Sequence, residues 1–134
     1  MKPSVLIVDD EKVICEGIAR LLSEKYITYQ AHNGSEAVDI LRNNRQIDVM
    51  LCDIIMPEMD GIALINEIRS VNKDIIIIVI TAFADPNKVC EAMKKGANNF
   101  MLKPLDIPLL EMTINYAARK KRLKTSDVPA LEGV

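Results

Sequence analysis

The stretch that decides the fold is Ile47-Asp48-Val49-Met50-Leu51-Cys52-Asp53, followed at once by Ile54-Ile55-Met56-Pro57-Glu58-Met59-Asp60-Gly61. A short apolar run that ends in turn residues predicts a buried strand, not a helix. Because this strand is apolar on both faces, we expect it inside a parallel sheet covered by helices. The Asp53 carboxylate would then stand where the strand leaves the sheet, which is where open α/β sheets hold their ligands. The alternative is an aspartate that only caps the next turn, and the rest of the chain decides between the two.

The composition is that of one globular domain, with 134 residues, 49% hydrophobic and 27% charged. With a formal net charge of -2, the chain has no excess of positive charge to attract nucleic acid or an anionic membrane surface. The longest apolar run, Ile75 to Ile80, is too short to span a bilayer, and Met1 to Ser4 lead into a strand instead of a signal-peptide core. We therefore expect a cytoplasmic domain that contacts neither membrane nor nucleic acid directly.

Three cysteines, Cys15, Cys52 and Cys90, are odd in number and have neither CxxC nor zinc-ligand spacing. This pattern argues against a disulfide or a metal role. We expect all three to be buried free thiols.

Strand-like and helix-like patterns alternate five times along the chain. The strand-like runs are Ser4–Val8, Tyr26–His32, the run that ends at Asp53, Ile75–Ile80 and Asn99–Leu102. A helical pattern follows each of them: Ile14, Ile18, Leu21 and Leu22; Ala37, Val38, Ile40 and Leu41; Ile62, Ile65 and Ile68; Pro86 to Gly96; and Ile107 to about Arg122. Such alternation predicts an α/β fold with a doubly wound parallel sheet and right-handed crossovers.

Local signals mark several of the helix ends. Asn33-Gly34-Ser35-Glu36 is a capping pattern, Asp60 can cap the third helix, Pro86 suits a helix start and Gly96 suits a helix stop. The basic cluster from Arg119 to Lys124 is interpreted as a solvated helix end that the helix dipole favours.

The composition near the C-terminus sets an expected domain boundary. Lys124 to Val134 shows no periodicity. We expect residues 1–122 to form the folded domain and 123–134 to be a flexible tail or the start of a linker.

Polar residues stand at the carboxyl ends of four predicted strands: Asp9-Asp10, Asp53, Thr81 and Lys103. A parallel sheet brings these side chains to one edge, where the three carboxylates repel one another and need a compensating cation. One ammonium does not neutralise three acids, whereas Mg²⁺ binds through one or two carboxylates, waters and a phosphate. In that setting Asp53 becomes a nucleophile, and Thr81 and Lys103 can donate to the oxygens of a transferred phosphoryl group.

With these residues in this order, the chain resembles a response-regulator receiver domain of two-component signalling from about Ser4 to Lys121. Asp9-Asp10 resembles the metal-binding pair of that family, and Asp53 in Asp-x-x-Met-Pro-x-Met-Asp-Gly resembles its phosphoacceptor. Thr81-Ala82 resembles the switch hydroxyl with its small neighbour. Phe100 resembles the switch aromatic, and Lys103-Pro104 resembles the phosphate-binding lysine with its proline.

The resemblance implies a flavodoxin-like (βα)5 fold with strand order 2-1-3-4-5 and a cis Lys103-Pro104 peptide. It also implies that Mg²⁺ is bound by Asp10, Asp53 and the backbone carbonyl of Ile55, with Asp9 acting through water. Thr81, Ala82 and Lys103 would bind the phosphoryl group.

The activity implied is that of a signalling switch. Asp53 would accept a phosphoryl group from a sensor histidine kinase or a phosphotransfer protein, and the domain would catalyse only its own phosphorylation and slow dephosphorylation. Thr81 and Phe100 would then change the face made by the fourth helix, fifth strand and fifth helix, a possible homodimer surface. We expect no output domain within this chain. The apolar residues Ile55 and Phe83, at positions that flank the water entrance in the family, predict a long-lived acyl phosphate.

Three other interpretations were weighed against this one. A phosphatase that forms an aspartyl phosphate resembles Asp-x-Asp-x-Thr, but Ile55 and Pro57 stand where its acid and hydroxyl belong. A flavin or nucleotide binder would need a Gly-rich loop after the first strand, where this chain has three acids. A receiver-like binding domain without phosphorylation is disfavoured because the set of acids, hydroxyl and lysine is complete.

Overall fold

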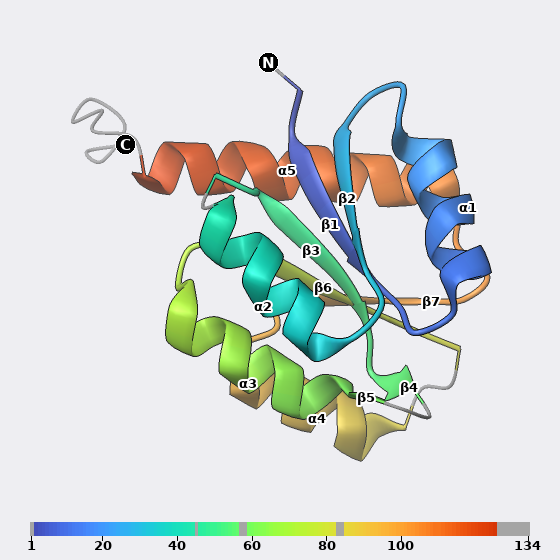
Figure 1. Cartoon of the computed structure of the whole chain (residues 1–134), viewed down its shortest axis with the longest axis vertical. Coiled ribbons are helices and arrows are strands. Elements are labelled where there is room, and N and C mark those ends of the chain that lie inside the picture. The colour runs from blue at the N-terminus through green and yellow to red at the C-terminus, as the bar shows by residue number, and fades with distance from the viewer. Residues whose placement is uncertain (1, 45, 57–58, 83–84, 126–134) are drawn as a thin grey trace.

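The structure is a computed structural model that describes residues 2–44, 46–56, 59–82 and 85–125. Its elements are β1 (Ser4–Val8), α1 (Lys12–Leu22), β2 (Ile27–Ala31), α2 (Gly34–Asn43), β3 (Val49–Asp53), β4 (Ile55–Met56), β5 (Met59–Asp60), α3 (Gly61–Val71), β6 (Ile76–Thr81), α4 (Pro86–Lys95), β7 (Asn99–Leu102) and α5 (Ile107–Thr125). Figure 1 shows one sheet between two layers of helices.

The main sheet has five parallel strands in the order β2-β1-β3-β6-β7. With the small β4–β5 pair set aside, this is the order 2-1-3-4-5, so the expected flavodoxin-like doubly wound fold is confirmed. The strand that ends at Asp53 lies at the centre of the sheet and is buried along its whole length.

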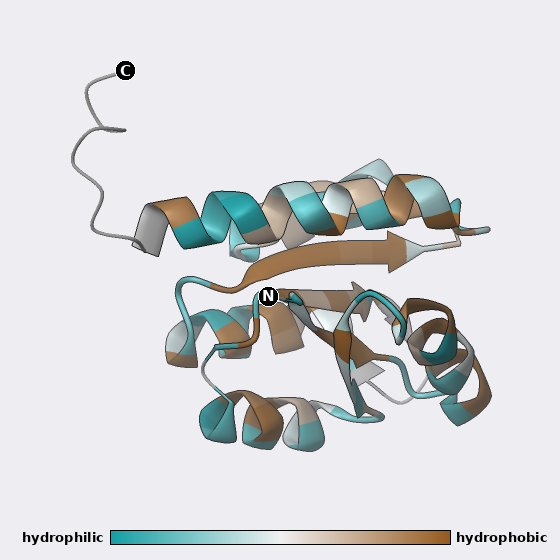
Figure 2. Ribbon diagram, turned by 90° about the horizontal axis from the view of Figure 1, so that it is seen from above, coloured by the Kyte–Doolittle hydropathy of each residue, from teal (hydrophilic) through white to brown (hydrophobic). Residues whose placement is uncertain are grey.

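Alternating side chains of the central strands build two cores, one on each face of the sheet. In β3, Met50 and Cys52 join the core under α2, α3 and α4, whereas Val49 and Leu51 join the core under α1 and α5. Figure 2 shows this layering, with apolar strand lying between α5 and the helices of the opposite face. The sheet is apolar on both faces because helices cover both of them.

The helix ends form where the capping signals predict them. Asn33 Oδ1 accepts a hydrogen bond from Glu36 N at 2.8 Å, and Asp60 Oδ1 accepts from Ile62 N at 3.0 Å. Pro86 opens α4, and Gly96 closes it with a positive φ of 125° that favours glycine.

Two features of the fold differ from the sequence expectations. The antiparallel pair β4–β5 was not predicted, because two residues on each side are too few to show a periodic pattern. Helix α5 continues to Thr125 instead of ending at about Arg122, and residues 126–134 of the expected tail lie outside the described residues.

The C-terminal part of α5 is tied to the residue that precedes β3. Asp48, 4% exposed, lies 3.6 Å from Lys121 Nζ and 3.2 Å from an Arg122 guanidinium nitrogen. It also accepts a hydrogen bond from Ser4 N at 2.9 Å. The expectation of a wholly solvated basic helix end is therefore wrong at Lys121, which is buried against this aspartate.

The cysteines divide into two kinds. Cys15 and Cys52 are buried as expected, and burial raises the pKa of the Cys15 thiol to about 11 and of the Cys52 thiol to about 12. Cys90 is exposed, so the expectation of three buried thiols is wrong there. The reason is its place on α4, a helix in which Ala92 is the one residue classed as buried.

The described residues include no helix long and apolar enough to cross a membrane.

At Gly61 the backbone of the neighbouring strand leaves no space for a side chain. A Cβ built there would lie 2.6 Å from the carbonyl oxygen of Asp53 and 2.7 Å from Cα of Ile54. We predict that Gly61→Ala lowers the free energy of unfolding by about 2–3 kcal/mol, because backbone atoms must move to relieve the overlap. Urea unfolding followed by circular dichroism measures the change.

Gly17→Ala is the matched control, since a Cβ at Gly17, inside α1, meets nothing within 4 Å. It should raise stability by about 0.5–1 kcal/mol through better helix propensity. Equal effects of the two substitutions would contradict the close approach of α3 to β3.

Candidate functional site

The parallel sheet brings the predicted polar residues to its carboxyl edge. Asp53 ends β3, beside β1 and β6, and pairs in register with Ile80. Thr81 ends β6 one residue later and pairs with Leu102, the last residue of β7. Asp9 and Asp10 follow β1 directly, and Lys103 follows β7. The segments that carry all five candidates therefore leave the sheet at the same edge.

Lys103 and Asp53 form the central contact of the site. Lys103 Nζ lies 2.8 Å from Asp53 Oδ2 and 3.9 Å from Asp9 Oδ2. The side chains of Asp53 and Asp9 are only 11% and 7% exposed, so this is an ion pair with little solvent screening. The strand end also fixes Lys103, whose backbone N–H donates to Thr81 O at 2.9 Å. The Lys103-Pro104 peptide is cis, as expected.

Asp9 is the acid of the cluster whose pKa is raised. Burial raises the pKa of its carboxyl above the ordinary value, and the charges of Asp53 and Asp10 raise it further. A hydrogen bond from Glu11 N, 2.9 Å from Asp9 Oδ1, and the charge of Lys103 act in the opposite direction. Because the net shift is upward, the contacts within the chain leave this acid undercompensated.

The donor chemistry of the cluster fits a hard divalent cation, because the charges of Asp53 and Asp10 lie close enough to raise the pKa of Asp9 and the three acids offer only oxygen ligands. Among the described residues, however, no three acidic, histidine or cysteine side chains already surround one point that could hold an ion. Lys103 binds Asp53 and approaches Asp9 instead. A metal would therefore have to share these carboxylates with the lysine.

The remaining predicted residues lie around this cluster. Thr81 is completely buried, whereas Ala82 is exposed. Phe100 pairs with Val79 in the sheet and has a side chain that is 42% exposed. The backbone of Ile55 belongs to β4, two residues after Asp53, but its side chain is outside the described part of the structure, and so is all of Phe83.

One contributor to the site was not identified from the sequence. Gly61 allows the first turn of α3 to lie against the backbone of Asp53 and Ile54. The available signal was a glycine directly after the capping residue Asp60, but glycine at a helix start is common and does not by itself indicate a close approach.

Comparison with known proteins agrees with the geometry. The family model described as the response regulator receiver domain matches residues 5–115. The solved response regulator receiver domain from Clostridium thermocellum superposes with a TM-score of 0.85 at 30% identity, covering 92% of this chain and 99% of that one.

Two curated relatives are longer proteins. The transcriptional regulatory protein ZraR of Klebsiella oxytoca is 37% identical over 125 residues, which cover 92% of this chain and 28% of that protein. A cyclic di-GMP phosphodiesterase of Thermotoga maritima is 33% identical over 119 residues, covering 88% of this chain and 32% of that protein. The chain thus spans about a third or less of the length of these relatives. Over that length, it belongs to the family of response-regulator receiver domains of two-component signalling systems.

Proposed function

We propose that this receiver domain is a phosphorylation switch in which Asp53 accepts a phosphoryl group from a phosphohistidine on a sensor kinase or a phosphotransfer protein. The observation that carries the proposal is the Lys103 ammonium, 2.8 Å from a nearly buried Asp53 carboxylate at the edge where the acids gather. The ammonium offsets the cost of holding this charge away from water, and a carboxylate fixed in this way can act as a nucleophile. We place this reaction in the cytoplasm.

The reaction follows from the groups around Asp53. A carboxylate oxygen attacks phosphorus, the bond from phosphorus to the imidazole nitrogen breaks, and its electron pair stays on the imidazole. Lys103 is placed to donate to the phosphoryl oxygens. The Thr81 hydroxyl and the Ala82 N–H are the other proposed donors to these oxygens. The catalysis consists of positioning and charge stabilisation.

Receiver domains generally bind Mg²⁺ at their acidic pocket. Here Asp10, Asp53 and the carbonyl of Ile55 are the proposed ligands, with Asp9 holding a bound water. The ion would supply positive charge against the phosphoryl oxygens. Its binding would also oppose the burial and the repulsion from Asp53 and Asp10 that together raise the pKa of Asp9.

Incubation with acetyl phosphate and Mg²⁺ tests the phosphoacceptor. The intact mass should increase by one phosphoryl group in the wild type and stay unchanged in Asp53→Asn, because an amide oxygen is a poor nucleophile. Asp39→Asn is the matched control, since Asp39 is an exposed acid on α2. Acyl phosphate on Asp53→Asn at the wild-type rate would refute the assignment.

Asp9→Asn tests the electrostatic account of the cluster. Removing one buried negative charge should raise the melting temperature in EDTA by about 3–5 °C, which corresponds to about 1 kcal/mol for a domain of this size. The same substitution, like Asp10→Asn, should reduce the further stabilisation that Mg²⁺ gives the wild type.

Thermal scans with and without Mg²⁺ measure both effects, and Asp39→Asn should show neither. A lower melting temperature of Asp9→Asn in EDTA would contradict the account, because it would mean that the Asp9 charge stabilises the fold.

The output surface in this proposal is the face of α4, β7 and α5. Its exposed apolar side chains are Met93, Phe100, Leu102, Leu109, Met112 and Tyr116. Phosphorylation would draw Thr81 inward and let Phe100 rotate into the space that Thr81 leaves, so that partners, including a second copy of the domain, meet a different surface. Burying a half-exposed phenylalanine contributes about 1–2 kcal/mol, enough to change a two-state ratio about tenfold.

Amide spectra recorded before and after phosphorylation test this switch. We expect the resonances from Glu91 to Ala117 to shift, and those of α2, which packs against β2 and β1 at the end of the strand order away from β7, to change little. Phe100→Ala should still be phosphorylated but should lose most of the shift in this region. Identical wild-type spectra across Glu91 to Ala117 would disprove the switch while leaving the phosphoacceptor assignment intact.

A further inference from the structure

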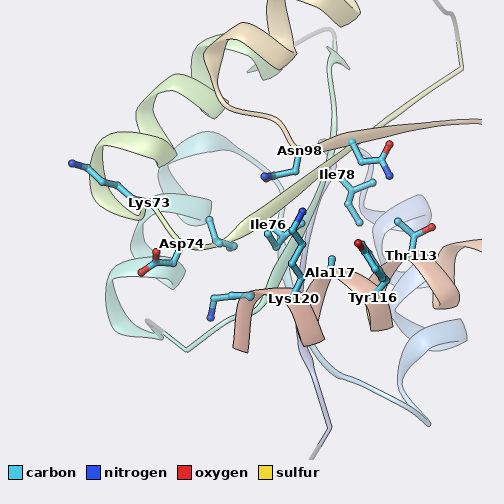
Figure 3. A pocket seen from close by; sticks show the side chains of 12 residues that line it. Lys73, Asp74, Ile76, Ile78, Asn98, Thr113, Tyr116, Ala117 and Lys120 are labelled. Atoms are coloured by element: carbon cyan, nitrogen blue, oxygen red, sulfur yellow. The ribbon is translucent and has the colours of Figure 1, made fainter. Parts of the chain in front are cut away.

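A cavity lies at the amino edge of the sheet, the edge opposite Asp53. It has a volume of about 270 Å³ and is bounded by the start of β6, the start of β7 and the C-terminal half of α5. Figure 3 shows Ile76, Ile78 and Ala117 at its centre, with Tyr116 beside them. This volume is just below the usual range of small-molecule sites, and a small, partly apolar molecule fits it.

Hydrogen bonding within the chain leaves donors at the wall of this cavity. Asn98, which lines the cavity, accepts at Oδ1 from an Arg69 guanidinium nitrogen at 2.6 Å and from Ile77 N at 2.8 Å, and its NH₂ group donates to none of the described residues. Asn99 Oδ1 accepts from Phe100 N at 2.8 Å, so its NH₂ group also remains available. The wall therefore offers amide donors whose matching acceptors are already used.

Lys120 adds the positive charge. Its side chain rises from α5 across the cavity toward Asn98, whereas Lys73 and Asp74 point outward from the rim (Figure 3). Within the described part of the chain, the Lys120 ammonium makes no hydrogen bond or ion pair, unlike Lys121, which is held by Asp48. An anion that enters the cavity meets this charge and the amide donors together.

The wall of the cavity is already ordered because hydrogen bonds from Arg69 hold it in place. The Arg69 guanidinium donates to Ile75 O at 2.6 Å, to Lys73 O at 3.3 Å and to Gly96 O at 2.9 Å, besides Asn98. A site that is already ordered loses less entropy when a ligand binds.

We propose that this cavity binds a small organic anion that combines a flat apolar body with a carboxylate. The carboxylate lies between the Lys120 ammonium and the Asn98 amide, and the body covers Ile76, Ile78 and Ala117 against the ring of Tyr116. This site is separate from the phosphoacceptor and does not depend on its function.

Titration of the full chain with naphthoate, followed by amide and side-chain NH₂ spectra, tests the site. A ligand of about 13 non-hydrogen atoms should bind with a Kd on the order of 1 mM. The NH₂ signals of Asn98 and Asn99 and the amides of 74–78 and 113–121 should shift, and those of Asp9 and Asp53 should not. Naphthamide, which has the same body without the charge, should bind about five- to tenfold more weakly.

Lys120→Gln should weaken naphthoate binding about five- to tenfold and leave naphthamide binding unchanged. Lys88→Gln is the matched control, because Lys88 is an exposed lysine on α4 outside the cavity. Both variants should accept phosphate from acetyl phosphate at the wild-type rate, so failure of this proposal is distinct from failure of the switch. Shifts centred elsewhere, equal affinity for the two probes, or unchanged naphthoate binding by Lys120→Gln would each overturn it.

Discussion

The ion pair between Lys103 and Asp53 is the interaction on which the proposed chemistry of this domain depends. Its Nζ–Oδ2 distance is 2.8 Å, and Asp9 lies close enough to the same ammonium to share it at 3.9 Å. Moving a carboxylate out of water costs several kcal/mol unless a partner compensates it. Lys103 lies closer to Asp53 than to Asp9, and burial raises the pKa of the Asp9 carboxyl. The cluster is therefore stable enough to fold but still attracts further positive charge.

Much of the fold and most of the candidate site could be predicted because both follow from repeated patterns. Apolar runs predicted the strands. A strand that is apolar on both faces, such as the one ending at Asp53, is expected inside a parallel sheet. Once strands are parallel, residues that follow each of them, such as Thr81 and Lys103, must leave at one edge. The side-chain contacts themselves were not predictable at this level, since the 2.8 Å contact depends on rotamers that periodicity does not describe.

What the sequence did not reveal depends on contacts between distant residues or on very short elements. Asp48 and Arg122 are 74 positions apart, and neither residue carries a local signal that it will meet the other. The β4–β5 pair is too short for a periodic pattern. Cys90 was expected to be buried because cysteine usually is. Its exposure follows from how little of α4 packs against the rest of the fold, which the local sequence does not show.

The two edges of the sheet differ in how their charges are balanced, and this difference decides where the domain can move. At the amino edge, Asp48 holds Lys121 and Arg122, and Arg69 donates to several carbonyls, so the end of α5 and the start of β7 are held in place. At the carboxyl edge, charge is incompletely balanced, and a phosphoryl group would change it further. Helix α4 has one residue classed as buried, and β7 is mostly exposed, so these two elements can shift with little loss of core packing. A charge added at Asp53, as in the proposed function, would thus be best relieved by motion of α4 and of the carboxyl end of β7, while the other strands and the α5 terminus stay fixed.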